Sequence, residues 1–320
     1  MTKLCGEDGH DLYLVASSFE PRSVKATAGL RPQQFSKAVI FNYRDTLDTV
    51  AGRHHAREIR RHMEEKEVGS THILECYFGD PYSAVRSFHT LIEAERFSGI
   101  RSVTVDITCF TKVHMLLLLQ FLEETLRIEK ITVWYTEPLS YATDFGRALS
   151  YGIDQAVYLP YVPAMHRSKG VGLIAFLGHE RSRLERIVHE LEPDVSVLIL
   201  GQPGFSKNMQ DYSRRVNQSL IHRTRYDEQY RMASSPANNA TESANVLMQE
   251  IARVVEHGCD SIYVAPLGTK LQALGIHSVR QKLRSVRLLL AYTIPKRYER
   301  NLYSQGSGKT HSVVLPSTTG

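Results

Sequence analysis

The stretches Ile131–Tyr141, ITVWYTEPLSY, and Leu288–Tyr298, LLLAYTIPKRY, decide the fold, because both follow the pattern Y-T-x-P-x-x-Y. This pattern is not a general feature of strands, so resemblance between unrelated strands does not explain it. Three further blocks recur in the same order, at offsets of 156 to 159 residues. They are Arg22-Ser23 with Arg181-Ser182, VDITCFTK ending at Lys112 with YVAPLGTK ending at Lys270, and GIDQAVYLP ending at Pro160 with GKTHSVVLP ending at Pro316. The chain is therefore predicted to be an internal duplication.

Each copy alternates short apolar runs with helical patterns, which predicts an α/β fold with a parallel sheet and helices on both faces. We expect two tandem Rossmann-like domains, residues 1–168 and 169–320. The Pro-containing linker is placed at Leu159–Gly170, the third strand of the second copy near Ser219–Tyr226, and an exposed loop at Ala233–Ala240. The other predicted strands are Leu12–Ala16, Ala38–Asn42, His72–Tyr77, Ser102–Asp106, Ile131–Thr136, Val171–Leu177, Val195–Leu200, Ser261–Ala265 and Val286–Tyr292, with helices that include Thr49–Glu67 and Ser243–His257.

Composition excludes several classes of protein. The 320 residues are 42% hydrophobic and 23% charged, as in ordinary globular proteins. The four cysteines form no C-x-x-C pair, which argues against a disulfide framework or a zinc ribbon. Charged residues precede the first apolar run, and no apolar run approaches the ~18 residues of a membrane span. We expect a cytoplasmic protein without a membrane partner; its net charge of +5 suits an anionic ligand but does not by itself indicate nucleic acid.

The repeated motifs follow the predicted strands, where parallel sheets bind ligands in a crevice near helix N-termini. The Thr-Lys pairs Thr111-Lys112 and Thr269-Lys270 could bind an anion through N–H groups and an ammonium. Alternatively, the threonines cap helices and the lysines are solvated. Preservation of the pair in both copies favours the ligand role. The candidate ligand-binding residues are Ser17, Ser18, Glu20, Arg22, Asp106, Thr108, Thr111, Lys112, Tyr135, Thr136, Tyr141, Gly178, Arg181, Gly268, Thr269, Lys270, Tyr292, Thr293 and Tyr298.

The repeated tyrosines leave two interpretations open. Tyr135 and Tyr292 have the position of core aromatics at strand ends. Tyr141 and Tyr298 follow a proline, in a predicted loop where a ring could stack on a base. Core packing and base stacking therefore remain alternatives for these side chains.

No catalytic set or metal site stands out. The segment Gly306–Thr310, GSGKT, resembles the end of a P-loop, but Tyr303 occupies the place of the required glycine and a strand-like run follows. His54, His55 and His114 lack metal-ligand spacing to any partner, so we expect no metal and no cofactor.

The segment Asp106–Lys112, DITCFTK, with Met115 after it, resembles the fourth-strand signature of CARF domains, the CRISPR-associated Rossmann fold. This chain keeps the Asp, both threonines and the lysine, whereas Cys109 and Phe110 stand where the family favours glycines. The second copy keeps Gly268-Thr269-Lys270 but lacks the Asp-x-Thr, and Ser17-Ser18 fit the polar first loop. The resemblance implies a pair of such domains binding a cyclic oligoadenylate or a related signal.

Three functions remain open at this stage. The first is a cytosolic receptor, in bacterial antiviral defence, that binds a nucleotide-type signal in a crevice shared by both halves and acts on a separate effector protein. The second is an enzyme that cleaves a nucleotide or cyclic oligonucleotide in that crevice, with Glu20, Asp106 or His179 near the phosphate. The third is a structural subunit of a defence complex. The sequence leaves open whether the protein is a homo-oligomer.

Overall fold

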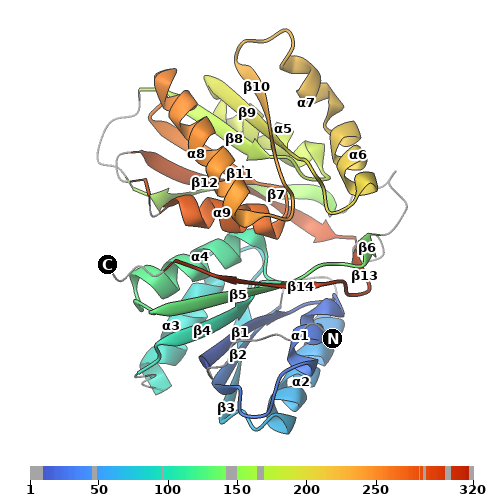
Figure 1. Cartoon of the computed structure of the whole chain (residues 1–320), viewed down its shortest axis with the longest axis vertical. Helices are drawn as coiled ribbons and strands as arrows, with labels where there is room; N and C mark the ends of the chain where they lie inside the picture. The colour runs from blue at the N-terminus through green and yellow to red at the C-terminus, as the bar shows by residue number, and fades with distance from the viewer. Residues whose placement is uncertain are drawn as a thin grey trace. The chain divides into compact units, whose positions relative to one another are not determined.

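Alternating strands and helices form two separate sheets in the computed structural model, which describes residues 10–44, 49–95, 97, 99–141, 150–163, 169–280, 282–283, 286–299 and 304–316. At positions 49 and 141 it describes the backbone alone. The chain divides into unit 1, Met1–Asp144 with Arg300–Gly320, and unit 2, Phe145–Glu299 (Figure 1).

Unit 1 contains a sheet whose described strands run in the order β14-β5-β4-β1-β2-β3. All neighbouring pairs are parallel except β14 with β5, which is antiparallel. A short ribbon of β6 and β13 belongs to the same unit. The elements are β1 (His10–Ser17), α1 (Arg22–Ala28), β2 (Phe35–Tyr43), α2 (Thr49–Glu65), β3 (Ser70–Cys76), α3 (Ser83–Glu95), β4 (Ser102–Asp106), α4 (Lys112–Glu124), β5 (Lys130–Thr136), β6 (Ser140–Tyr141), β13 (Ser304–Gln305) and β14 (Thr310–Val314).

Unit 2 repeats this arrangement with the described strand order β7-β12-β11-β8-β9-β10, in which only β7 is antiparallel to its neighbour. Read strand by strand, this is the order of unit 1, which confirms the predicted α/β fold with two similar halves. Thr269 precedes the helix after β11 as Thr111 precedes the helix after β4, and Tyr292 lies in β12 as Tyr135 lies in β5. The elements are β7 (Ser150–Val162), β8 (Val171–Phe176), α5 (Arg181–Leu191), β9 (Val195–Gly201), α6 (Lys207–Val216), α7 (Gln218–Arg223), β10 (Tyr230–Ser235), α8 (Ala240–Glu256), β11 (Ser261–Pro266), α9 (Lys270–Arg280) and β12 (Arg287–Tyr298).

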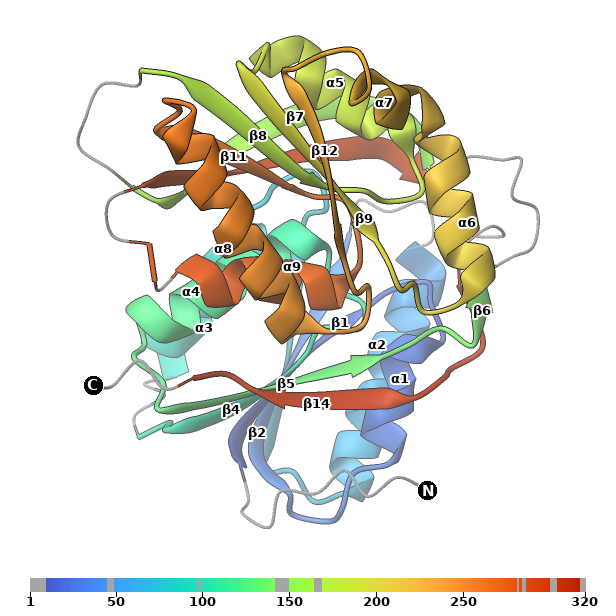
Figure 2. The same ribbon diagram turned by 45° about the horizontal axis from the view of Figure 1, so that its top comes forward.

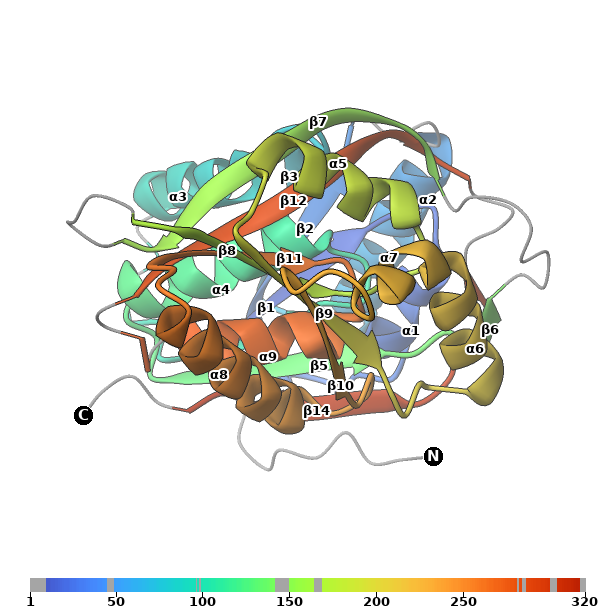
Figure 3. The same cartoon turned by 90° about the horizontal axis from the view of Figure 1, so that it is seen from above.

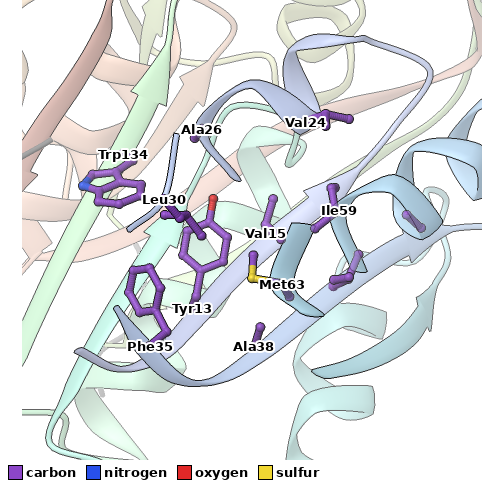
Figure 4. Packing of buried hydrophobic residues seen from close by; sticks show 12 residues of the cluster. Tyr13, Val15, Val24, Ala26, Leu30, Phe35, Ala38, Ile59, Met63 and Trp134 are labelled. Atoms are coloured by element: carbon purple, nitrogen blue, oxygen red, sulfur yellow. The ribbon is translucent and has the colours of Figure 1, made fainter. Parts of the chain in front are cut away.

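Apolar side chains on both faces of each sheet explain why the central strands read as nearly continuous hydrophobic runs. In unit 1, Tyr13 of β1 packs among Phe35, Leu30 and Trp134, and side chains of α1 and α2 complete this core (Figure 4). The opposite face contacts α3 and α4 through aromatic pairs such as Phe41 with Phe88. Unit 2 has a matching core among β8, β9, β11 and α5.

The antiparallel edge strand of each sheet is exchanged between the two copies of the repeat. The sheet of unit 1 takes β14, which follows the second copy, and the sheet of unit 2 takes β7, which follows the first copy. By the repeat, residues 152–160 correspond to residues 308–316, yet β7 pairs with β12 in unit 2 and β14 pairs with β5 in unit 1. Figure 2 shows β14 running along β5. The expected division at residue 168 therefore differs from the division into units, because it keeps β7 with the first copy and β14 with the second.

Three local predictions for the second copy were wrong. Residues 218–223 form α7, and the third strand is β10 at Tyr230–Ser235. The start of the expected loop at Ala233 therefore belongs to β10, and Ala237 is buried. The expected linker begins inside β7, which continues to Val162. In β7 and β10, pairing with a neighbouring strand overrode weak local sequence signals.

Candidate functional site

Each Thr-Lys motif begins a helix at the carboxyl end of a strand, as predicted. Thr111 Oγ1 accepts a hydrogen bond from the N–H of His114 at 3.3 Å, which caps α4. Thr269 Oγ1 accepts from the N–H of Gln272 at 3.1 Å, and Gln272 Oε1 accepts from the N–H of Thr269 at 2.9 Å. The second arrangement is a capping box. The hydroxyls thus have the capping role that the alternative interpretation gave them, and Lys112 and Lys270 occupy the first helical position, partly exposed.

A side chain three positions after each threonine connects the helix start to the third strand of the same unit. In unit 1 this residue is His114, and in unit 2 it is Gln272. His114 Nε2 lies 2.8 Å from the carbonyl oxygen of Asp80, which follows β3. Gln272, its counterpart in the repeat, donates from Nε2 to the carbonyl oxygen of Ser235 at the end of β10, at 3.4 Å. Different side chains therefore hold the two helix starts in equivalent positions.

Asp106 and Thr108 are fully buried and shape the loop after β4. The Asp106 carboxylate accepts from the hydroxyl of Tyr13 at 3.1 Å and from the N–H of Thr108 at 2.9 Å. Thr108 Oγ1 in turn accepts from the N–H of Thr136 at 2.9 Å. Burial raises the pKa of Asp106 above its ordinary value, against the lowering effect of these hydrogen bonds. These contacts give Asp106 a structural role at this edge of the sheet.

The first-strand loop contains a second internal network. Ser17 Oγ lies 3.0 Å from Asn42 Oδ1 and is fully buried, which joins the ends of β1 and β2. Ser18 Oγ accepts from the N–H of Glu20 at 3.0 Å, and the Ser18 carbonyl oxygen lies 2.7 Å from His55 Nδ1. Ser18 is the partly exposed member of the pair, so it is the serine that a ligand could reach.

A buried cluster of Glu20, Arg22, Thr136 and Ser304, here named cluster 1, ties the first-strand loop to β5 and β13. Arg22 Nη2 lies 2.5 Å from Glu20 Oε2, and Arg22 Nη1 donates to the Thr136 carbonyl oxygen at 2.7 Å. Arg22 Nε also donates to Ser304 Oγ at 3.0 Å, and Ser304 donates to the Glu20 carboxylate. Thr136, more than 100 residues away in the sequence, is thus brought to Glu20 and Arg22.

Unit 2 contains an equivalent set, Ser150, Glu180, Arg183 and Thr293, here named cluster 2. Arg183 Nη2 donates to the Thr293 carbonyl oxygen at 2.5 Å and lies in an ion pair with Glu180, Nη1 to Oε2, at 3.4 Å. Ser150 Oγ donates to Glu180 Oε1 at 2.5 Å. Ser150 begins β7 as Ser304 forms β13, so each cluster takes its serine from the exchanged segment.

The structural counterpart of Arg22 is therefore Arg183 and not Arg181, which the repeat had aligned with it. Arg181 is exposed, with Nε 3.1 Å from Glu185 Oε1 and Nη1 donating to Ser219 Oγ at 3.2 Å. Burial acts to lower the pKa of Arg183, but Tyr292, Tyr298 and Glu180 raise it above its ordinary value, so the side chain stays cationic.

Two glycines among the candidates allow close approach of neighbouring groups. A Cβ on Gly178 would lie 2.2 Å from the carbonyl oxygen of Leu267, so the loop after β8 contacts the loop after β11 only with glycine there. A Cβ on Gly268 would lie 2.2 Å from Oε1 of Gln272, the acceptor in the capping box. Both glycines thus set the shape of the loop edge in unit 2.

The core interpretation fits the two strand tyrosines. Tyr135 is 4% exposed and Tyr292 is 2% exposed, and the guanidinium of Arg183 lies 4.8 Å from the Tyr292 ring centre. Tyr298 is partly exposed but ends β12 and is not in a loop, because the strand continues through an irregularity at Pro295. Proline is tolerated there because β11 pairs with β12 only as far as Leu290. The side chain of Tyr141 lies outside the described part of the chain.

Sequence reasoning missed a Glu–His pair in unit 1. His311 Nε2 contacts Glu137 Oε1, and the His311 ring stacks on Tyr135 with ring centres 6.3 Å apart. Both side chains are about one-fifth exposed (22% and 23%). Within the described residues, no hydrogen bond involves His311 Nδ1. The repeat places Gln155 and Ile294 at the corresponding positions, so the pair is specific to unit 1.

The other residues missed are those of the two clusters, Ser150, Glu180, Arg183 and Ser304. A glutamate followed two or three residues later by arginine occurs after the first strand of both copies and could have indicated the ion pairs. Nothing local indicates the serines, because the strand exchange brings them in. In the part of the chain that is described, no three His, Cys, Asp or Glu side chains are placed to hold a metal ion. No helix in that part is both long and apolar enough to cross a membrane.

Comparison with known proteins gives a similarity of fold. No family model and no curated protein matches the sequence. The solved structure of a type III CRISPR defence DNA nuclease activated by cyclic oligoadenylate aligns with a TM-score of 0.50 and 12% identity, over 89% of this chain and 66% of that one. The chain thus spans just under two thirds of that nuclease. A protein from Pseudomonas aeruginosa UCBPP-PA14, assigned as a universal stress protein, aligns at 12% identity over 88% of this chain and 92% of that one, but its TM-score of 0.25 carries no argument. The first alignment confirms the CARF-like resemblance at the level of the fold.

Proposed function

We propose that this chain is a receptor for a nucleotide-type signal, with a cyclic oligonucleotide as the ligand class, in antiviral defence. The observation that carries the proposal is the duplicated Thr-Lys helix start, in which a lysine occupies the first helical position after the fourth strand of each unit. N–H groups at a helix start together with an ammonium suit a phosphate. The fold similarity to a nuclease activated by cyclic oligoadenylate supports this ligand class.

The proposal includes a cytosolic location and a separately encoded effector protein that responds to the bound ligand. All described helices and strands belong to the two duplicated units. The buried carboxylates of Glu20 and Asp106 are held in contacts within unit 1. A receptor needs a rigid, preorganised edge, which the capped helix starts provide. This favours binding over catalysis by those two carboxylates.

A direct test is mass spectrometry of small molecules that co-purify with the full chain, followed by thermal melting with cyclic oligoadenylates and mononucleotides. A ligand at a hundredfold excess over its Kd raises the unfolding free energy by about 2.7 kcal/mol. Absence of any co-purified nucleotide, together with unchanged melting for every compound, would refute the receptor proposal.

Lys112→Ala and Lys270→Ala test the residues that carry it. A lysine that donates to phosphate contributes roughly 1.5–3 kcal/mol, so each variant should weaken binding about tenfold to over a hundredfold. Lys25→Ala removes an exposed lysine of α1 and is the matched control. If Lys112→Ala abolishes binding while Lys270→Ala has no effect, the prediction that both copies act on one ligand is wrong.

The Glu137–His311 pair favours a second candidate, hydrolysis of the bound nucleotide. A carboxylate on one ring nitrogen orients the imidazole, and the other nitrogen can take a proton from an attacking hydroxyl and return it to the leaving oxygen. Chromatography of the ligand after incubation separates the two functions, because a receptor releases it intact.

A further inference from the structure

One segment of unit 2 presents several exposed basic side chains. Residues 207–226, which comprise α6, α7 and the three residues after them, contain five Lys or Arg side chains and a single acid, Asp211. The net charge of this segment is +4. Figure 3 shows α6 and α7 as consecutive helices along one side of unit 2.

The basic side chains of this segment lie outward. On α6, Lys207, Arg214 and Arg215 are spaced at i, i+7 and i+8, which places them on one helix face, and all three are exposed. Tyr212 and Ser213 face the opposite way and are buried. The remaining members, Arg223 and Arg225, are exposed at and just after the end of α7.

None of the four arginines forms an ion pair within the described residues, and three of them contact neutral groups. Arg214 Nη2 donates to Gln202 Oε1 at 2.9 Å, and the Arg215 guanidinium lies over the Tyr212 ring. Arg223 Nη1 donates to the Tyr230 hydroxyl at 3.1 Å. Asp227 and Glu228 follow the segment, but neither forms an ion pair with these arginines.

Two exposed arginines of α2 show the compensated arrangement, because acids one turn further along the helix neutralise them. On α2, Arg60 lies 3.1 Å from Glu64 Oε1 and Arg61 lies 3.3 Å from Glu65 Oε1. Arg60 and Arg61 therefore provide compensated positions for comparison, on the helix that occupies the same place in unit 1.

Next to the arginines stands Tyr226, which is 87% exposed. A side chain of this size normally buries its ring or finds a partner. Unpaired bases stack on exposed aromatic rings, and the planar guanidinium matches phosphate geometry. A duplex has no unstacked base to place on this ring, so an unpaired strand is the nucleic acid that uses both the arginines and the ring.

We propose that this arginine face, Lys207, Arg214, Arg215, Arg223, Arg225 and Tyr226, binds single-stranded nucleic acid. The phosphates lie along the arginines and a base stacks on Tyr226. Residues 223–226 precede β10 and lie at the amino end of the strands, whereas Lys207 begins α6 after β9 and Arg214 contacts Gln202, which follows the carboxyl end of β9. The arginine face shares no residue with the candidate ligand-binding set, so its variants test a separate site.

The test is fluorescence anisotropy of the full chain with labelled 20-nucleotide single-stranded DNA and RNA of mixed sequence, at salt concentrations of about 50 to 200 mM. Arg214→Ala/Arg215→Ala should weaken binding about tenfold or more. It should also reduce the slope of log affinity against log salt by about 1.4, at about 0.7 per phosphate contact. Arg60→Ala/Arg61→Ala removes the same charge from exposed positions of α2 and should leave binding unchanged. Equal losses for both double variants, or no binding by the unaltered chain at the lowest salt, would overturn the proposal.

Tyr226→Ala separates nucleic acid from other polyanions. It should weaken binding of single strands about fivefold to a hundredfold and leave the weak binding of a duplex of the same sequence unchanged. If Tyr226→Ala has no effect and polyglutamate competes as well as the oligonucleotide does, the face is a docking surface for acidic protein and the proposal is wrong.

Discussion

Replacing Arg22 with alanine leaves the carboxylate of Glu20 buried without its cation. In the intact chain Arg22 is 3% exposed and Glu20 is 6% exposed, so water cannot take over the lost contacts. The substitution removes the ion pair, the hydrogen bond to Thr136 and the hydrogen bond to Ser304 at once. These contacts tie β13 and the first-strand loop to β5.

The expected cost follows from that geometry. Breaking a buried ion pair by removing one partner costs about 3–5 kcal/mol, whereas loss of an exposed pair costs under about 1 kcal/mol. With a urea dependence near 2 kcal/mol per molar, the unfolding midpoint of unit 1 should fall by about 1.5–2.5 M. Adding Glu20→Gln should restore part of this stability, because it removes the unpaired charge.

The assay uses Trp134, the only tryptophan of the chain. It is 5% exposed in the core of unit 1, and its register partner is Ser312 of β14, so its fluorescence reports on unfolding of unit 1 and on loss of the exchanged strand. Urea titration followed at this tryptophan gives the midpoint for each variant.

Arg183→Ala is the matched control, because it breaks cluster 2 in unit 2 while leaving cluster 1 intact. It should shift unfolding followed by far-ultraviolet circular dichroism, with a smaller change in the Trp134 transition. If Arg22→Ala changes the midpoint of the Trp134 transition by less than about 0.25 M, cluster 1 does not hold the exchanged strand in place. If Arg183→Ala shifts the midpoint of the Trp134 transition as much as Arg22→Ala does, the same conclusion follows.

Three further predictions concern single groups. Burial raises the pKa of Asp106, so the folded chain holds this proton to higher pH than the unfolded chain; stability is lost as pH rises from about 4 through the folded pKa. Asp106→Asn removes this loss of stability with pH. The unfolding free energy of the variant minus that of the original chain should therefore be larger at pH 8 than at pH 4, and an equal difference at both pH values would contradict a raised pKa for Asp106. If the Glu137–His311 pair is catalytic, His311→Gln should abolish ligand hydrolysis with little change in binding, measured by product chromatography beside titration, whereas unchanged turnover would leave the pair structural. Lys309→Ala should leave any nucleotide triphosphatase activity unaltered, since β14 directly follows it, and loss of a robust activity would show that the P-loop-like segment is a real site.

The candidate site could be predicted from the sequence only in part. The Thr-Lys pairs were identified because their motif is local and repeated, and the structure places both at helix starts. Asp106, Glu20 and Arg22 were chosen as ligand contacts from their position after strands, but they are buried in internal networks. Position along a strand is visible in a sequence, whereas the direction and burial of a side chain depend on neighbours that are distant in the chain.

The sequence by itself determined the duplication, the α/β alternation and the equivalence of β7 with β14, because hydrophobic periodicity and a repeated motif are local properties. Only the tertiary structure decided which sheet each of these strands joins. An edge strand pairs through backbone hydrogen bonds, which any copy of the strand can form, so the repeat cannot show the exchange. The exchange in turn brings Ser304 to Glu20 and Ser150 to Glu180. Contacts with Glu180 and Thr293 likewise make Arg183 the counterpart of Arg22. These contacts depend on how the chain is connected in space, and no spacing of residues along it records them.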